Sequence, residues 1–307
     1  NNFLAGVFRA GDVTGLALLD VSTGLFTGEE LSGAEALNDA LRRYSPMECA
    51  VSSEQAGDAD LRKALTDGVS AQISSCDGWT FEYGAARDTM MRHFGVHSLE
   101  GFGCEGSTAV VGAAGGILHY VKEELKRLVG HIRTFSVRNP AEFMLLDEAT
   151  CSNLDLIPLR GRNSQFNLLK VLDVTRTAMG ARLLRDWMLR PLKNLGRIQG
   201  RHDAVEAFCR DRTLLHNMRE SLGAVRDLER LIARIGAGTG NARDVAGLGK
   251  SLEAAPGIRK HAEGHPVSLL RDLAAAVLPI PELEGLIKRA IVDEPPITIK
   301  DGGMIRA

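Results

Sequence analysis

Between Thr177 and Pro191 the apolar side chains recur every three to four residues, which is typical of a helix with one apolar face. This face consists of Met179, Leu183, Leu184, Trp187 and Met188. Thr177 is a preferred N-cap residue, and Pro191 is placed to end the helix. Gly180 lies within the apolar face, where a glycine costs roughly 1 kcal/mol of helix propensity. We therefore expect a buried face and a close approach of another backbone at Gly180.

The pattern differs between the two parts of the chain. Up to residue 118, short apolar runs alternate with amphipathic stretches and with turns such as Gly11-Asp12, which predicts an α/β fold that begins with a hairpin. Strands are expected at 4–8, 16–20, 25–27 and 49–52, and helices at 34–44 and 60–65, with Gly24 and Gly28 bracketing the third strand. From Leu168 onward the pattern is helical, with segments at 194–209, 214–222, 227–235, 241–252 and 267–278.

A long helix is expected at residues 108–128, where small apolar residues give way to charged ones. We expect this helix to bridge two domains, followed by short extended pieces at 132–137 and 143–146. A chain of 307 residues is long enough for two domains. The predicted organisation is an α/β domain over residues 1–128 and a mostly helical, all-α domain over residues 129–307.

Composition and charge narrow the class of protein. An apolar fraction of 44% favours packed cores over disorder, and no apolar run approaches the roughly 18–20 residues that span a membrane. Five scattered cysteines without a Cys-x-x-Cys pair indicate reduced thiols in a cytoplasmic protein. The net charge of −2 conceals an asymmetry, since residues 1–118 carry −9 and residues 119–307 carry +7. The basic part would tolerate nearby DNA phosphate, although solvated helix faces explain the same arginines.

The segment from Val171 to Leu192 closely resembles a signature of the MutS family of DNA mismatch-repair proteins, in the core domain where long lever helices begin. Other segments resemble the same family in the same order along the chain. They are Asn1–Ala5, Leu19–Gly24 and Leu99–Gly103 in the connector domain, Asp147–Thr150 and Asn153–Leu156 at the entry to the core, Asp227–Ile235 in a core helix, and Pro295-Pro296 with Asp301–Gly303 before the descending lever. Coincidence explains such a collinear series poorly.

This resemblance implies an RNase-H-like connector domain followed by the first part of a core (lever) domain. Because the chain does not begin with Met, we expect it to be a piece of a longer protein. The ATPase of the family would lie outside residues 1–307, so ATP and magnesium would serve the parent protein, and neither a cofactor nor catalysis is expected here. The resemblance implies a MutL-type partner, duplex DNA bound by the complete protein, and a homodimeric cytoplasmic parent without a membrane segment. A related branch that acts outside mismatch repair lacks the connector, which favours the mismatch-repair branch.

Three glycine-rich strings imitate nucleotide-binding motifs. Gly247–Ser251 resembles the end of a P-loop, but Asp244 stands where that motif needs a glycine, and the pattern around it is helical. Gly101–Gly106 matches the dinucleotide fingerprint, yet it follows a helical stretch at 89–96 instead of a strand. Gly236–Gly240 precedes Asn241, a good N-cap. We expect a helix interior and two interhelix turns, respectively.

Candidate metal ligands are few. His93 with His97 and His261 with His265 have the spacing of one helix face, but a glycine inside each pair weakens that helix. Asp20 resembles the metal-binding aspartate on the first strand of RNase-H-like nucleases, and two-metal cleavage needs three or four convergent carboxylates. Glu54, Asp88 and Glu105 are possible companions, although nothing in their spacing selects them. The simpler expectation is a strand-end aspartate that binds the backbone of the hairpin.

Two alternatives to a connector and core segment stay open at this point. One is a metal-dependent nuclease built on residues 1–118, and the other is weak, non-specific duplex DNA binding by the basic helical half. The sequence assigns no catalytic, metal, cofactor or DNA-binding residue.

Overall fold

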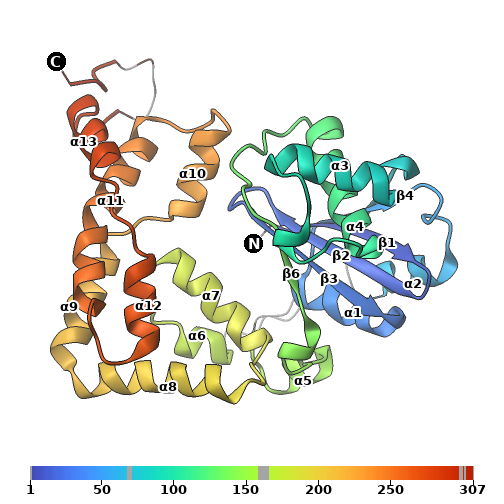
Figure 1. Cartoon of the computed structure of the whole chain (residues 1–307), viewed down its shortest axis with the longest axis horizontal. Coiled ribbons are helices and arrows are strands. Elements are labelled where there is room, and N and C mark those ends of the chain that lie inside the picture. The colour runs from blue at the N-terminus through green and yellow to red at the C-terminus, as the bar shows by residue number, and fades with distance from the viewer. Residues whose placement is uncertain (1, 68–70, 158–165, 297–299, 301, 307) are drawn as a thin grey trace. The chain divides into compact units, whose positions relative to one another are not determined.

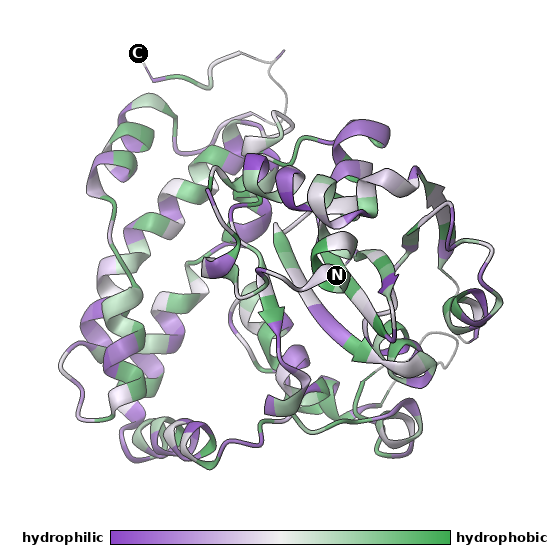
Figure 2. Cartoon of the chain, turned by 45° about the vertical axis from the view of Figure 1, so that its right-hand side comes forward, coloured by the Kyte–Doolittle hydropathy of each residue, from purple (hydrophilic) through white to green (hydrophobic). Residues whose placement is uncertain are grey.

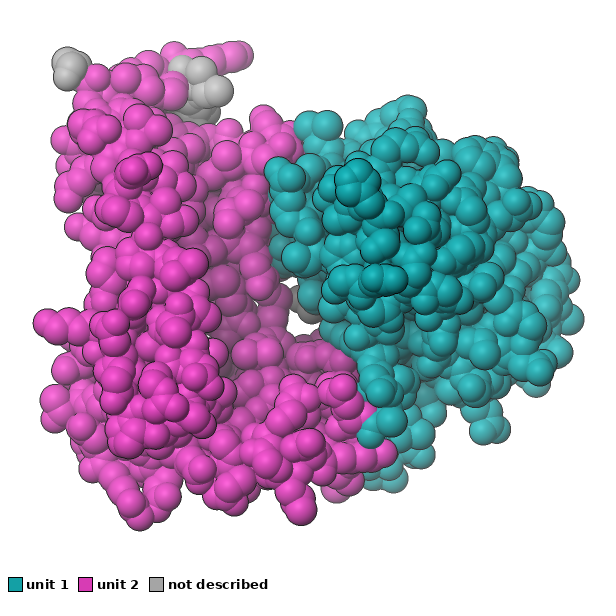
Figure 3. All heavy atoms as spheres, viewed as in Figure 1, with its two compact units in different colours: residues 1–141, 145–153 teal, residues 142–144, 154–307 magenta. Residues whose placement is uncertain are grey.

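The computed structural model describes residues 2–67, 71–157, 166–296, 300 and 302–306. The first residue of the motif at 301–303 therefore lies outside the described part. The chain divides into two compact units (Figure 3). Unit 1 contains residues 1–141 and 145–153, and unit 2 contains residues 142–144 and 154–307.

Unit 1 is built on a mixed sheet of six strands in the order β5-β4-β1-β2-β3-β6. The strands are β1 (Leu4–Ala10), β2 (Val13–Asp20), β3 (Leu25–Ser32), β4 (Glu48–Ser52), β5 (Gln72–Cys76) and β6 (Ser136–Arg138). The first three form an antiparallel meander, while β4 pairs in parallel with β1, β5 with β4, and β6 with β3. The meander, with β4 and β5 beside β1, is the RNase-H-like arrangement that the resemblance implies. The pairing of β1 with β2 confirms the predicted hairpin, and Gly11 in its turn has a φ of 62°.

Helices cover both faces of this sheet (Figure 1). One face packs against α1 (Gly33–Tyr44) and α2 (Ala59–Thr66), and the other against α3 (Tyr83–Phe94) and α4 (Thr108–His119). Successive residues of a strand point to opposite faces, so the central strand β2 is apolar on both sides: Leu16 and Leu18 lie in one core, and Ala17 and Leu19 in the other. A short helix, α5 (Glu148–Asn153), joins the same unit, where Arg42 of α1 pairs with Glu148.

Helix α4 is shorter than predicted and does not bridge two domains. Its residues from Ala109 to Leu118 are all buried within unit 1. A π-helical turn at Tyr120–Glu124 follows, and the chain leaves the helix at Leu125. Small residues explain this placement, because a Cβ added at Gly6 or Gly15 would overlap backbone atoms of α4. Gly28 was expected at the end of the third strand but lies inside β3. A larger residue would not fit there, because a Cβ at this position would overlap the side chains of Phe135 and Val110.

Unit 2 is helical in its described part, apart from isolated β-bridges. Its helices are α6 (Leu168–Leu172), α7 (Ala178–Leu189), α8 (Leu195–Arg210), α9 (Arg212–Gly223), α10 (Leu228–Gly236), α11 (Ala242–Ala262), α12 (Ser268–Ala276) and α13 (Pro281–Ala290). Helix α11 is central and packs against α9, α10, α12 and α13. Figure 2 shows hydrophobic and hydrophilic residues alternating along these helices. The side chains of Asn194, Asp227 and Asn241 cap α8, α10 and α11, and for Asn241 this confirms the predicted cap.

The prediction for α7 is correct in its start and wrong in its buried face. Thr177 caps the helix by accepting a hydrogen bond of 3.0 Å from the backbone N–H of Gly180. Leu183 remains 50% exposed and Trp187 39% exposed, and it is the guanidinium of Arg201 in α8, 3.5 Å from the ring centroid, that lies over the Trp187 ring. A Cβ at Gly180 would first meet the hydroxyl of Thr177, so the glycine gives room to its own cap and not to a second backbone.

Candidate functional site

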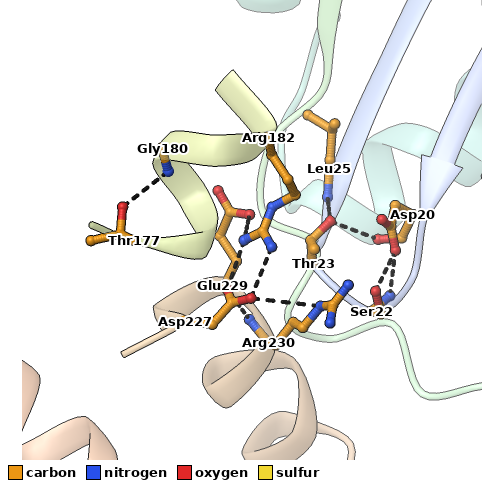
Figure 4. A network of polar contacts seen from close by, with 10 residues as sticks. All are labelled: Asp20, Ser22, Thr23, Leu25, Thr177, Gly180, Arg182, Asp227, Glu229 and Arg230. Atoms are coloured by element: carbon orange, nitrogen blue, oxygen red, sulfur yellow. Dashed lines mark hydrogen bonds and ion pairs between the residues drawn. The ribbon is translucent and has the colours of Figure 1, made fainter. Parts of the chain in front are cut away.

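Asp20 is the last residue of β2 and is fully buried. Its Oδ1 accepts hydrogen bonds from the backbone N–H of Ser22 at 2.9 Å and from the Ser22 hydroxyl at 2.6 Å (Figure 4). Its own carbonyl oxygen accepts from the backbone N–H of Gly24 at 2.8 Å. Asp20 therefore organises the turn between β2 and β3, which confirms the structural expectation for this residue, and it lies on the second strand of the sheet.

Glu105, one of the companions that a nuclease would need, is engaged by other residues. Glu105 pairs with Arg87 at 2.7 Å and also accepts from the backbone of Leu99, which holds the pKa of Glu105 below its usual range. Across the described ranges, no group of three or more His, Cys, Asp or Glu side chains could hold a metal ion. The described residues thus offer no two-metal centre around Asp20.

The histidine pairs do not share a helix face. Helix α3 ends at Phe94, and Gly95 with a φ of 68° turns the chain away before His97. The Nε2 of His93 lies 2.9 Å from the carbonyl oxygen of Ile132, and burial lowers the pKa of His93. Helix α11 similarly ends at Ala262, between His261 and His265. Neither pair therefore holds both of its rings on one helix face.

The glycine strings have the structures predicted for them. Gly247–Ser251 lies inside α11, and Asp244 belongs to a capping box with Asn241. Gly101–Gly106 forms a turn ahead of α4, where Gly103 and Gly106 have positive φ angles, and Gly236–Gly240 separates α10 from α11. None of the three follows a strand with the geometry of a phosphate loop.

A charged network joins α7 to α10 within unit 2 (Figure 4). The guanidinium of Arg182 donates to the two carboxylate oxygens of Asp227 at 2.8 and 2.6 Å and to Glu229 at 2.6 Å. These hydrogen bonds raise the pKa of Arg182 and lower that of Asp227. Arg230 adds a second cation, 3.6 Å from Asp227. The sequence places Asp227 at the start of α10, but nothing in the pattern predicts its partner 45 residues earlier.

A polar groove of about 580 Å³ in unit 1 was not predicted from the sequence. It lies between the 3-10 turn Gly78–Phe81, helix α3 and the end of α4. Trp79 stands at this groove with 53% of its surface exposed, and its ring meets the His119 ring edge-on at a centroid distance of 5.2 Å. Asp88, Arg92 and Lys122 supply charges of both signs around the indole. We name this region the Trp79 groove.

Comparison with known proteins agrees with the fold. A family model described as MutS domain II matches residues 2–133, and another described as MutS domain III matches residues 149–307. The chain belongs to the MutS family. Its two matched parts are the connector (domain II) and the core (domain III) of a MutS mismatch-repair protein.

Relatives in this family cover the whole chain. A DNA mismatch repair protein MutS from Symbiobacterium thermophilum is 37% identical over 311 residues, and another from Methanococcoides burtonii is 35% identical over 315 residues. In both cases the match covers 100% of this chain and 35% of the relative. The chain thus spans about a third of the length of these relatives. Among the described residues, no helix combines the length and the apolar character needed to cross a membrane.

Proposed function

We propose that this segment links mismatch recognition to the ATPase within a complete MutS protein, and that its connector offers a docking surface to a MutL-type partner. Coupling between distant sites needs stiff elements with discrete arrangements. The pairing of Arg182 with Asp227, which joins α7 to the capped start of α10, supports this mechanical role. The complete protein would bind duplex DNA and ATP, form a homodimer and act in the cytoplasm.

The Trp79 groove is the observation that carries the docking proposal. Tryptophan is enriched among residues that dominate binding energy at protein interfaces, and such residues are surrounded by a polar rim. Trp79 is half-exposed, although a residue of this size is usually more buried in a folded domain. It is also held in place by His119 and by the 3-10 turn. A partner side chain that covers the indole would bury a large apolar surface without first ordering it.

The test is a binding titration of this chain against the N-terminal domain of its cognate MutL-type protein. Trp79→Ala should weaken binding at least tenfold, in line with the roughly 2 kcal/mol of an interface hot spot. Met47→Ala is the matched control, since Met47 lies in the same unit, is 51% exposed and does not line the groove. Equal affinities of the wild type and Trp79→Ala would contradict docking at this groove.

A further inference from the structure

A cleft of about 750 Å³ lies in unit 2 between α10, α11 and the segment Asp293–Pro295. This volume is in the range of sites that bind small molecules. Charged residues dominate its lining. The cations are Arg226, Arg230, Arg234, Arg243 and Lys250, and the anions are Asp227, Asp244, Asp293 and Glu294.

Three of the four carboxylates are already neutralised. Asp227 is bound by Arg182 and Arg230, and Asp244 is paired with Arg234 at 2.9 Å. Asp293 is paired with Arg306 at 2.6 Å. Among the described residues, this leaves Glu294 as the lining carboxylate without an ion pair.

Three lining cations form no ion pair with a carboxylate of the described residues. Within the described part of the chain, neither Arg226 nor Lys250 forms an ion pair. Arg243 uses its Nε to donate to the carbonyl oxygen of Pro295 at 2.9 Å, and its two terminal nitrogens make no hydrogen bond within the described part of the chain. Arg226, Arg243 and Lys250 are all exposed. The unsatisfied charge of the cleft is therefore positive.

Helix geometry points these cations to the same side. Arg243, Gly247 and Lys250 are spaced by four and three residues along α11, so they share one face of that helix. A Cβ built on Gly247 would be in ordinary van der Waals contact with Leu231 at 3.6 Å and with the stem of Arg226 at 3.7 Å. The stem of Arg226 thus reaches across to α11, at the middle of the same face.

We propose that this cleft binds a ligand with two or more linked phosphate groups through Arg226, Arg243 and Lys250. Arginine matches phosphate oxygens with paired donors, and lysine adds a compact charge. Lys250 belongs to the string that imitates a P-loop, yet here the phosphates would be held by side chains, since the backbone amides around it are used within α11. The phosphates come from a free polyphosphate, such as a nucleotide, or from a nucleic-acid backbone. The concave shape favours the free polyphosphate.

The test measures binding of pyrophosphate and tripolyphosphate to the intact chain by calorimetry and by thermal shift. Saturating ligand should raise the unfolding temperature, because it binds the folded state. Arg226→Gln and Lys250→Gln should each weaken binding about tenfold or more, the loss expected for one charged hydrogen-bonding partner. Arg212→Gln, which removes an equal charge at the start of α9 outside the cleft, should bind as the wild type does.

A second arm identifies the source of the phosphate. The same variants are titrated with a labelled 20-base-pair duplex with and without pyrophosphate. If pyrophosphate displaces the duplex and both cleft variants weaken duplex binding, the ligand is a nucleic-acid backbone. If the chain binds pyrophosphate without such duplex binding, the ligand is a free polyphosphate. Absence of binding in both arms overturns the proposal. So does binding that Arg226→Gln and Lys250→Gln leave unchanged, or that Arg212→Gln weakens equally. All three substitutions are at exposed positions, and circular dichroism checks that each variant is folded.

Discussion

Arg182 donates one hydrogen bond to each carboxylate oxygen of Asp227, so two helices that are far apart in sequence are joined through one planar contact. Asp227 is also the N-cap of α10 and accepts from the backbone N–H of Arg230. Its carboxylate therefore caps α10 and binds Arg182 of α7 at the same time. Separation of the two helices would leave Arg182 without its main partner and would remove a cation from the α10 cap.

Arg182→Met should destabilise unit 2 by about 1–3 kcal/mol, because it leaves a partly buried carboxylate without its strongest donor. The side chains of Arg182 and Asp227 are only 17% and 19% exposed. Arg197→Met is the control, since its pair with Glu142 is about half exposed on both sides and should be worth less than about 1 kcal/mol. Urea unfolding followed by circular dichroism compares the two, and equal losses would contradict a special role for the Arg182 pair.

The same contact makes stability depend on pH. Hydrogen bonding from Arg182 holds the pKa of Asp227 below its usual range. A lowered folded-state pKa stabilises the fold at pH values above the unfolded pKa, and this contribution is lost as pH falls through the folded pKa. The difference in unfolding free energy between wild type and Asp227→Asn should thus be constant near neutral pH and shrink below about pH 4. Denaturant titrations from pH 6 to pH 2 measure this difference in unfolding free energy. A difference that grows on acidification would contradict a lowered pKa of Asp227 in the folded state.

Asp20→Ala should cost about 1–2 kcal/mol of stability, since it removes the acceptor of two hydrogen bonds in the β2–β3 turn. Removal of Oδ2, which is buried and has no partner among the described residues, offsets part of that loss. Asp12→Ala, at the exposed turn between β1 and β2, should change stability by less than about 0.5 kcal/mol. Thermal unfolding gives both values. Metal-dependent cleavage of DNA that Asp20→Asn abolished would instead restore the nuclease hypothesis.

Gly15→Ala should destabilise unit 1 by roughly 1–3 kcal/mol or more, because the new methyl group would meet the backbone of Ala109. Neither a rotamer change nor a side-chain shift relieves a clash with backbone atoms. Gly57→Ala is the matched substitution, since a Cβ there has open space around it. Chemical unfolding of the two variants should separate them clearly, and similar midpoints would mean that α4 can move off the sheet at little cost.

Duplex DNA should bind this chain weakly and without preference for a mismatch, since the net charge of +7 in residues 119–307 attracts phosphate but reads no bases. Affinity should fall steeply as salt rises from 50 to 200 mM, through release of counterions. Fluorescence anisotropy with matched and mismatched duplexes tests this expectation. Salt-resistant selection of the mismatched duplex would contradict it.

Local signals predicted the features that depend on neighbouring residues. Thr177 and Asn241 were predicted as helix caps because a cap needs only its own side chain and the next three residues, and these are visible in the sequence. The hairpin turn at Gly11 and the interior position of Gly247–Ser251 followed from the same kind of evidence. The family resemblance supplied the arrangement of the sheet, which the alternation of strands and helices alone would have left as α/β.

Features that depend on tertiary contacts escaped prediction. The end of α4 is set by a π-helical turn against the sheet, whereas the helical pattern continues to residue 128. The extended piece predicted at 132–137 overlaps β6, but the pairing of β6 with β3, about a hundred residues earlier, leaves no local mark in the sequence. The exposed ring of Trp79 also could not be read from the sequence, because an isolated tryptophan is more often buried than exposed.

The seating of α4 on Gly6 and Gly15 has a mechanical consequence. At Gly6 and Gly15 the backbone of the sheet meets the backbone of α4, and no side-chain rotamer there can change to let the helix come closer, so these two contacts limit how near α4 lies to the sheet. A force on one end of α4 would then displace the helix and the sheet together as a rigid body, with little repacking of side chains inside the connector. Deformation of this part of the protein would then take place in the segments outside that contact.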